Sequence, residues 1–440
     1  MKIIKKYIFL IILFASFQIA SQTILTKKEA LRITLQNNYG IKIATNNLEV
    51  AKNNSAILNS GFLPTISATS GANYRRENQE ITSQDGTSTS VEGAVTKTYN
   101  ASVGLNYTIF DGLGRKYNYK QLQETYNLTE LQARETIENT YLQLFTVYFQ
   151  IARLSENTAN LQEAVKISKQ RLQRAKYQYD YGQSTRLELL NAEVDVNNDS
   201  INFINSRQEY LNAKRSLNII LGVQKDNNNF DVETDVEFTE LMTFDELVEK
   251  AKENNVLLKQ NEKNIAISEF NIKVNKANYL PTLGFSASYG WNKSENPETS
   301  FLAQSYSNGL NAGLNLSWTL FDGGTTKTRM DNAKIALENQ EILLEQQEET
   351  LINTLRNTWD DYNNRLFVLK AQEQNVLTAQ NNFERTEERY KLGQVSSIEF
   401  RQAQINLINT KTALNNAKFD AKLIELQLLQ ISGEILNVNF

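Results

Sequence analysis

The side chains that could carry chemistry in this sequence are of few kinds. The 440 residues include no cysteine and no histidine, which excludes thiol nucleophiles, imidazole acid–base catalysis and the usual zinc ligands. Carboxylate, lysine, serine or tyrosine chemistry stays open. A glycoside hydrolase with two carboxylates is one such alternative, but no cleft-like cluster supports it. We therefore predict a protein that is not an enzyme and needs no cofactor or metal.

A glycine–glutamine pair occurs twice in comparable surroundings, at Gly182-Gln183 and at Gly393-Gln394. No proline occurs in the sixty-odd residues before either pair. Each of those stretches is therefore predicted to be one helix about 100 Å long. Glycine readily takes the left-handed backbone conformation that ends a helix. The pairs are predicted to form helix-to-helix turns at the far end of a rod.

The chain also matches itself in three places that keep their order, which is the signature of an internal duplication. We assign residues 22–222 to a first structural repeat and residues 223–440 to a second. The matching segments are 61–66 with 278–283, 107–112 with 318–323, and 179–183 with 390–394.

Each repeat contains two segments in which apolar or small residues alternate with polar ones, and this period of two predicts strands. Aromatic residues near the strand ends are typical of membrane β-barrels, although a half-buried soluble sheet has the same pattern. The polar segments 75–96 and 292–305 are predicted to be loops. The alternating residues are Ile66, Ala68, Ser70, Ala72 and Tyr74; Tyr99, Ala101, Val103, Leu105, Tyr107 and Ile109; Leu283, Phe285, Ala287, Tyr289 and Trp291; and Leu310, Ala312, Leu314, Leu316, Trp318 and Leu320.

Four strands per chain do not close a barrel, and an open sheet edge in lipid leaves backbone groups without partners. Two chains would give eight strands, whose interior side chains fill. Three chains would give twelve strands and leave a passage. The strand count therefore predicts an oligomer, and the passage favours a homotrimer.

The segments after each glycine–glutamine pair have apolar or small residues at spacings of three and four, which predicts a coiled-coil seam. Asp199 and Thr410 are the polar exceptions. Helices 41–61 and 185–221 together approach the length of the long helix, so they are predicted to line it end to end. The seam residues are Leu189, Ala192, Val196, Phe203, Ser206, Tyr210, Ala213, Leu217 and Ile220, then Phe400, Ala403, Leu407, Leu414, Ala417, Ala421, Ile424, Leu428 and Ile431.

The N-terminus has the features of a secretory signal peptide, which we assign to residues 1–21. Lysines at positions 2, 5 and 6 precede an apolar run over 7–17, and small residues follow. The run is too short to span a bilayer as a helix. The formal charge of the whole chain is −4, and loss of the three signal lysines would leave about −7. An acidic exported chain is a poor binder of nucleic acid.

Taken together, the pattern resembles the TolC family of outer-membrane efflux proteins over essentially the whole mature chain. The resemblance rests on the duplication, on Leu-Pro before each first strand, on Phe-Asp-Gly after each second strand, and on the segment 389–404. It implies a trimeric channel of mixed α and β structure, located in the cell outer membrane and extending into the periplasm. Its parts are a twelve-stranded β-barrel in outer-membrane lipid, a long α-helical periplasmic tunnel, and an equatorial layer at 24–40, 222–254 and the C-terminus.

The resemblance also implies site residues at the tunnel's closed end. Contact with a periplasmic adaptor, which links the channel to an inner-membrane pump or exporter, is implied for Gly182, Gln183, Gly393 and Gln394. Glu399 matches an inward-facing acid that narrows the pore, Glu188 is its partner in the first repeat, and Gln402 replaces the family's second acid. Any acidic constriction is therefore expected to be single-layered. Tyr390 matches a closed-state latch, but Val395 stands where its usual arginine partner would be.

The function predicted is an outer-membrane channel subunit of a tripartite efflux or type I secretion system. An exported coiled-coil interaction or adaptor protein is the alternative, and it has no need of the alternating strands. Drug, metal and protein cargo are not distinguished, although only three methionines disfavour a methionine-lined copper path. The adaptor, the pump, the resting state of the channel and the signal cleavage site also stay open.

Overall fold

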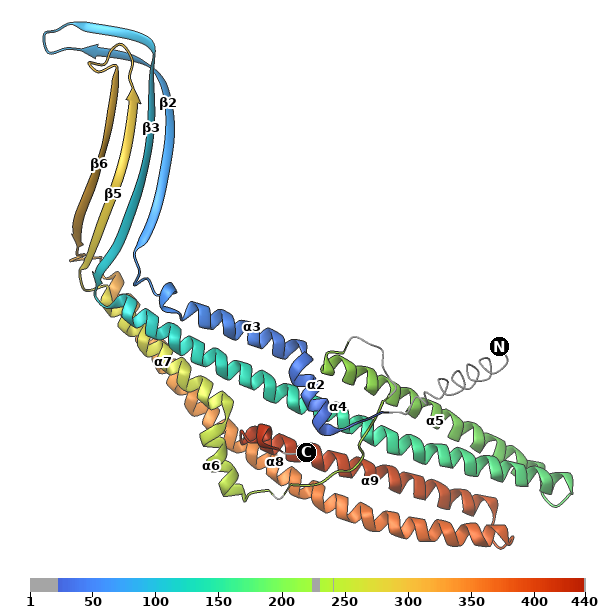
Figure 1. The fold of residues 1–440 in the computed structure, drawn as a ribbon. Coiled ribbons are helices and arrows are strands. Elements are labelled where there is room, and N and C mark those ends of the chain that lie inside the picture. Colours follow the sequence, from blue (N-terminus) through green and yellow to red (C-terminus); the bar gives the residue numbers. More distant parts are fainter. Residues whose placement is uncertain (1–22, 224–229, 240, 439–440) are drawn as a thin grey trace, which may run out of the picture. The chain divides into compact units, whose positions relative to one another are not determined.

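The computed structural model describes residues 23–223, 230–239 and 241–438 (Figure 1). The predicted signal peptide lies outside these residues. The same order of helix, two strands, long helix and shorter helix occurs twice. The first series is α3 (Tyr39–Asn54), β2 (Thr65–Thr82), β3 (Ser88–Asp111), α4 (Gly114–Asp180) and α5 (Arg186–Leu221); the second is α7 (Val256–Ala277), β5 (Thr282–Glu295), β6 (Gln304–Ser317), α8 (Thr325–Lys391) and α9 (Ser397–Ile431).

The chain divides into two compact units, and α4 and α8 contribute residues to both. One unit, the strand unit, consists of residues 46–131 and 259–346. The other, the hairpin unit, consists of the residues up to 45 together with 132–258 and 347–440. Among the described residues, no helix is long and apolar enough to cross a membrane.

The strand unit contains one antiparallel sheet with the strand order β2-β3-β5-β6. The two hairpins join through β3 and β5, where Val103 pairs with Tyr289. Each strand has polar and apolar residues on alternate faces, as the period of two predicted. Within the described chain, β2 and β6 each have a partner on one side alone, so both edges of the sheet present backbone groups for further pairing.

The first polar loop was predicted wrongly, since most of 75–96 is strand. The β2–β3 ladder continues from Thr65 paired with Asn106 to Thr82 paired with Ser88, with one register shift between Glu77 and Gln79. A hairpin supplies both partners of its own ladder, so it needs no buried apolar face to pair its backbone. Threonine and valine are also good strand formers, and the loop shrinks to the residues between β2 and β3.

The second hairpin differs from the prediction at both ends. β5 continues to Glu295 and β6 begins at Gln304, so the second loop is shorter than 292–305. Strand β6 ends at Ser317, and therefore Trp318 and Leu320 lie outside it. The Trp318 indole donates a hydrogen bond to the Tyr279 carbonyl over 3.1 Å, which ties the chain after β6 to the chain before β5.

The helix predicted at 41–61 is shorter than expected. α3 ends at Asn54, and a 3-10 turn, η1 (Ile57–Asn59), precedes Gly61 with its φ of +74°. Asparagine and serine side chains compete for backbone hydrogen bonds and favour helix ends, and Asn53, Asn54 and Ser55 come together here. The other helices agree with the expected bounds to within a few residues.

The hairpin unit also holds the segments predicted as an equatorial layer. β1 (Thr23–Leu25) pairs in parallel with β4 (Phe230–Val232), and α2 (Lys27–Asn37) and α6 (Phe244–Asn254) lie in the same unit. A row of aromatic side chains on α4 forms the core beneath them. The core residues are Tyr141, Phe145, Tyr148 and Phe149 from α4 with Leu217, Phe230, Phe419 and Leu426.

Tyr148 ties this core to the small sheet. Its buried hydroxyl donates to the Leu25 carbonyl over 2.6 Å and accepts from the Glu233 amide over 3.0 Å. One phenol thereby fixes the chain beside β1 and beside β4. Burial raises the pKa of Tyr148 above its usual value, so the hydroxyl stays protonated and keeps both hydrogen bonds.

Four helices of the hairpin unit lie side by side in the order α5, α4, α9, α8 (Figure 1). Helix α4 packs against α5, where the Thr158 and Ser206 hydroxyls are 2.8 Å apart. It also packs against α9, where Lys418 Nζ lies 2.8 Å from Glu156 Oε1. The predicted seam residues are buried or half-buried along α5 and α9, so this prediction is confirmed.

Candidate functional site

The two predicted turns close the α4–α5 and α8–α9 hairpins. Gly182 and Gly393 have φ values of +70° and +73°. The Gly182 amide donates to the Tyr179 carbonyl and the next amide donates to the Gln178 carbonyl, over 2.9 and 2.7 Å, and the Gly393 turn repeats this pattern. This paired pattern ends a helix with glycine in the left-handed conformation. All four glycine and glutamine residues are exposed, while their contact with an adaptor stays a prediction.

The Gly393 turn allows a direct test of the backbone argument. A methyl group added at Gly393 would meet no atom within 4 Å, so alanine is opposed by the positive φ alone, at about 1–2 kcal/mol. Asparagine tolerates this conformation better. We expect Gly393→Ala to speed amide hydrogen exchange around the turn and Gly393→Asn to speed it less. Equal exchange in wild type and Gly393→Ala would contradict the argument.

Glu399 caps its own helix. Its carboxylate accepts hydrogen bonds from the Ser396 amide and hydroxyl over 2.8 and 2.9 Å, and the Ser396 hydroxyl in turn accepts from the Glu399 amide over 3.2 Å. The hydrogen bonds from Ser396 hold the pKa of Glu399 below its usual value. The Ser-x-x-Glu spacing that signals this capping box was present in the sequence and was not used in the prediction.

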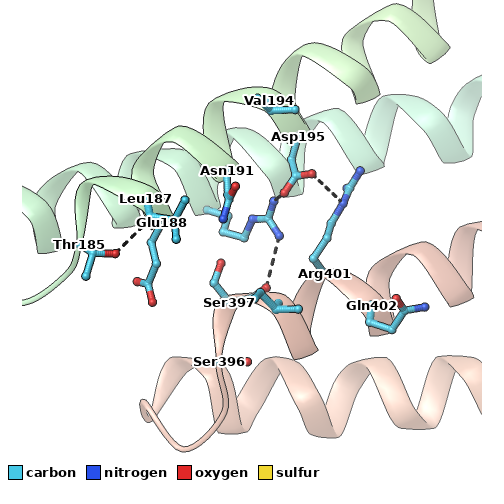
Figure 2. A pocket seen from close by; sticks show the side chains of 12 residues that line it. Thr185, Leu187, Glu188, Asn191, Val194, Asp195, Ser396, Ser397, Arg401 and Gln402 are labelled. Carbon is cyan, nitrogen blue, oxygen red and sulfur yellow. Dashed lines mark hydrogen bonds and ion pairs between the residues drawn. The ribbon is translucent and has the colours of Figure 1, made fainter.

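A pocket of about 380 Å³ lies beside these caps, between the first turns of α5 and α9 (Figure 2). Two predicted constriction residues, Glu188 and Gln402, line it, and Glu399 is not among its lining residues. Glu188 accepts a hydrogen bond from the Ser184 hydroxyl, and Gln402 donates one along its own helix to Asn406 over 2.9 Å. The structure thus brings two of the three residues together. Their role at a pore stays a prediction.

The pocket is backed by a buried to half-buried cluster of two arginines and two aspartates that the sequence reading missed. Arg401 on α9 donates to both oxygens of Asp199 on α5, each over 2.7 Å. Its Nε lies 3.4 Å from Asp195, and Asp195 also accepts from Arg171 on α4 (Figure 2). The two positive and two negative charges balance one another, and the cluster joins α4, α5 and α9.

The surroundings of the cluster satisfy much of its remaining hydrogen-bonding capacity. Ser168 donates to Asp199, and Gln404 donates to the Ala164 carbonyl over 3.1 Å. Burial alone would lower the pKa of Arg401, but the hydrogen bonds and charge of Asp199, with the charge of Asp195, outweigh it and raise that pKa. The Arg401 side chain therefore stays charged at any ordinary pH. The polar exception in the predicted seam, Asp199, was the one available signal.

Tyr390, the predicted latch residue on α8, contacts side chains of α9 and α4. Its ring stacks on Phe400 with centroids 4.7 Å apart and an interplanar angle of 10°. The Arg174 guanidinium lies over the Tyr390 ring, 4.8 Å from its centroid. Its partners here are thus Phe400 and Arg174, from α9 and α4. Whether this packing holds a closed state is not tested by the geometry, so the latch stays a prediction.

Comparisons with known proteins agree with this architecture. A family model described as "Outer membrane efflux protein" matches residues 30–223 and 247–434. The outer membrane protein TolC of Vibrio cholerae is 22% identical over 394 residues, which cover 86% of this chain and 85% of TolC. The outer-membrane channel CmeC of Campylobacter jejuni has a TM-score of 0.78 at 16% identity, covering 93% of this chain and 85% of CmeC. The outer membrane protein VceC of Vibrio cholerae has a TM-score of 0.72 at 13% identity, covering 92% and 95%.

Proposed function

Because this chain belongs to the outer membrane efflux protein family, we propose that it is one subunit of an outer-membrane channel. The channel is a passive duct through which an efflux or type I secretion system exports cargo from the periplasm to the outside. The observation that carries the proposal is a sheet with two unpaired edges in the same chain as two long helical hairpins. An exported coiled-coil stalk or adaptor would have no use for that sheet.

The open edges at β2 and β6 support assembly into a trimer. In lipid, each unpaired backbone group costs several kcal/mol, so a membrane sheet must close on itself. Closure by three copies pairs β6 of one copy with β2 of the next and yields twelve strands, enough to leave a passage. The barrel's outer face then contacts outer-membrane lipid, and the duct itself performs no catalysis.

The tip turns at Gly182-Gln183 and Gly393-Gln394 are the proposed docking points for a periplasmic adaptor that connects to an inner-membrane pump or exporter. Two features support this role: the turns are exposed, and the same turn occurs in both repeats. Both turns present the same backbone geometry at the ends of two helical hairpins, so an adaptor of repeated sequence could engage each in the same way.

The experiment that tests the channel is extraction in detergent followed by measurement of mass and conductance. We expect the mature protein to run as a trimer and to form ion-conducting pores in planar bilayers. A water-soluble monomer after removal of the signal would overturn the proposal. A trimer that never conducts under any applied voltage or pH would overturn the proposal that the protein is an open passage for cargo.

A charge test addresses the proposed constriction at Glu399. Because Ser396 lowers the pKa of Glu399, its charge persists as pH falls past the usual value of 4.5 and is lost only below it. We expect cation selectivity of wild type to persist to correspondingly low pH and that of Glu399→Gln to be reduced at neutral pH. Glu193→Gln, which removes an exposed carboxylate of α5 outside the pocket, is the control. Identical selectivity in wild type and Glu399→Gln across pH would remove Glu399 from the constriction.

A further inference from the structure

The basic residues of the four strands in the strand unit all lie toward one end of the sheet. This end carries the turns of the two hairpins, and the opposite end connects to the helices (Figure 1). With the helices in the periplasm, as proposed above, the turn end faces the outside of the cell. The basic residues are Arg75 and Arg76 in β2, Lys97 in β3 and Lys293 in β5, while β6 has none.

The strand register places three of these four residues on the apolar face of the sheet. Residues directly opposite each other in an antiparallel pair project to the same face. Lys97 is opposite Tyr74, and Lys293 is opposite Tyr99. Arg76 lies two residues beyond Tyr74 on the same strand, and a spacing of two keeps a side chain on one face. We call Arg76, Lys97 and Lys293 the basic belt.

The basic belt lies at the edge of the apolar band of this face. Along β3 the band runs from Tyr99 to Ile109, which is eleven residues, and a tilted strand needs about 9–11 residues to cross a membrane. Lys97 comes two residues before the band, and Lys293 is level with its first residue. The basic belt is therefore at the level of the lipid head groups on the outer side.

Aromatic side chains mark the same level. Trp291 in β5 and Tyr306 in β6 have ring centroids 6.0 Å apart, and Tyr306 is directly opposite Lys293. Tyrosine and tryptophan form girdles where the apolar band of a membrane barrel meets water. The cations thus lie among and just above the girdle, with apolar surface below them.

The basic belt carries more positive charge than its neighbours neutralise. Lys293 donates to Glu295 over 2.7 Å, and Lys97 Nζ lies 3.9 Å from the same carboxylate. Arg76 is exposed and forms no ion pair within the described residues. A methyl group added at Gly93 would come within 2.9 Å of Arg76 Nε, so glycine leaves room for the guanidinium there. Three cations share one carboxylate, and two positive charges are left without a partner.

Phosphate is the group that such a belt recognises. Arginine and lysine form charge-assisted hydrogen bonds with phosphate oxygens, and an anionic lipid surface attracts basic residues that lie close to it. The level of the belt decides the source of the phosphate. The outer leaflet of an outer membrane consists of glycolipid whose sugar phosphates lie directly above its acyl chains, and the belt has the matching order of cations above apolar surface.

We propose that Arg76, Lys97 and Lys293 bind the phosphate groups of an outer-leaflet glycolipid of the lipid A kind, whose acyl chains lie against the apolar face below. The inference rests on the outer-membrane channel proposed above and on its orientation. It adds a lipid site to each copy and names the lipid class. The bound phosphates neutralise the charge that Glu295 leaves unbalanced, and they fix the height of the sheet in the membrane.

The test measures binding of lipid A to the protein purified in detergent from membranes. Wild type and the triple variant Arg76→Gln, Lys97→Gln and Lys293→Gln are titrated with diphosphorylated lipid A. Each basic side chain near an anionic lipid surface contributes about fivefold to binding, so we expect the triple variant to bind about 100-fold more weakly. Dephosphorylated lipid A and phosphatidylglycerol are titrated in parallel, and both are expected to bind wild type more weakly than diphosphorylated lipid A does.

The matched control removes the same kinds of side chain from another part of the chain. Lys169→Gln and Lys176→Gln in α4 with Arg207→Gln in α5 replace two exposed lysines and one exposed arginine of the hairpin unit. The net charge changes as much as in the belt variant. This control is expected to bind diphosphorylated lipid A as wild type does.

A single variant, Glu295→Gln, tests the proposal in the opposite direction and serves if the triple variant does not assemble. The change removes the carboxylate that competes with phosphate for Lys97 and Lys293. We expect diphosphorylated lipid A to bind a few-fold more tightly than to wild type. Unchanged or weaker binding would contradict a role of the two lysines as phosphate ligands.

The outcomes separate the lipid site from the channel. If wild type is a conducting trimer and the triple variant binds lipid A equally well, the basic belt is not the site and the channel stands. Equal loss of binding in the helix control would overturn the belt as well. Equal binding of dephosphorylated lipid A would overturn recognition of phosphate, and equal binding of phosphatidylglycerol would overturn the choice of a glycolipid. If wild type is a water-soluble monomer, the proposed channel itself fails.

Discussion

Replacing Arg401 with methionine is expected to destabilise the hairpin unit by about 3–5 kcal/mol, because the change leaves the buried carboxylate of Asp199 without its partner. Asp199 is 4% exposed and receives both of its arginine hydrogen bonds from Arg401. Asp195 would keep Arg171 and lose its second cation. Denaturant unfolding in detergent micelles, followed by the helical circular dichroism signal, measures the loss.

The matched control for this variant is Lys166→Met. Lys166 forms an ion pair with Glu163 on the surface of α4, with both side chains more than half exposed, and such pairs contribute at most about 1 kcal/mol. Asp199→Asn combined with Arg401→Met should cost less than the sum of the single changes, since the second change removes a charge already unpaired. Strict additivity, or a loss no larger than in the control, would contradict a coupled buried cluster.

The second large effect is expected from Phe145→Ala in the core beneath the small sheet. Phe145 is fully buried, with its ring centroid 4.8 Å from that of Tyr141 and 5.9 Å from that of Phe149. Truncation of such a phenylalanine costs about 3–5 kcal/mol, from lost burial and from the cavity left behind. We expect a lower unfolding midpoint together with faster proteolysis near β1 and β4.

Phe301→Ala is the control for the core variant, because Phe301 is fully exposed in the single chain and its loss should change stability by less than about 0.5 kcal/mol. A midpoint for Phe145→Ala that equals that of Phe301→Ala would show that the aromatic row does not form the core. Lowered stability in both variants would instead place Phe301 in a contact that the single chain lacks.

Much of the architecture followed from the sequence, because the features concerned are local and repeated. The helices α4, α5, α8 and α9, the glycine turns and the four strands depend on hydrophobic period, proline placement and left-handed glycine. Each of these acts within a few residues and occurs in both repeats. The errors were at segment ends, such as the polar ladder of β2 and β3, where pairing with another strand outweighs the local pattern.

The opening observation, that few side chains here could do chemistry, was decided by composition alone. What composition could not show is how the remaining charges are used. Glu399 was read as a pore acid and caps its helix, while Arg171, Asp195 and Arg401 were not singled out at all. Their meeting depends on three helices from both repeats packing at one level, where Arg401 contacts Asp199, which is 202 positions away in the sequence. Periodicity determined the helices and strands; tertiary packing decided which charges are buried together.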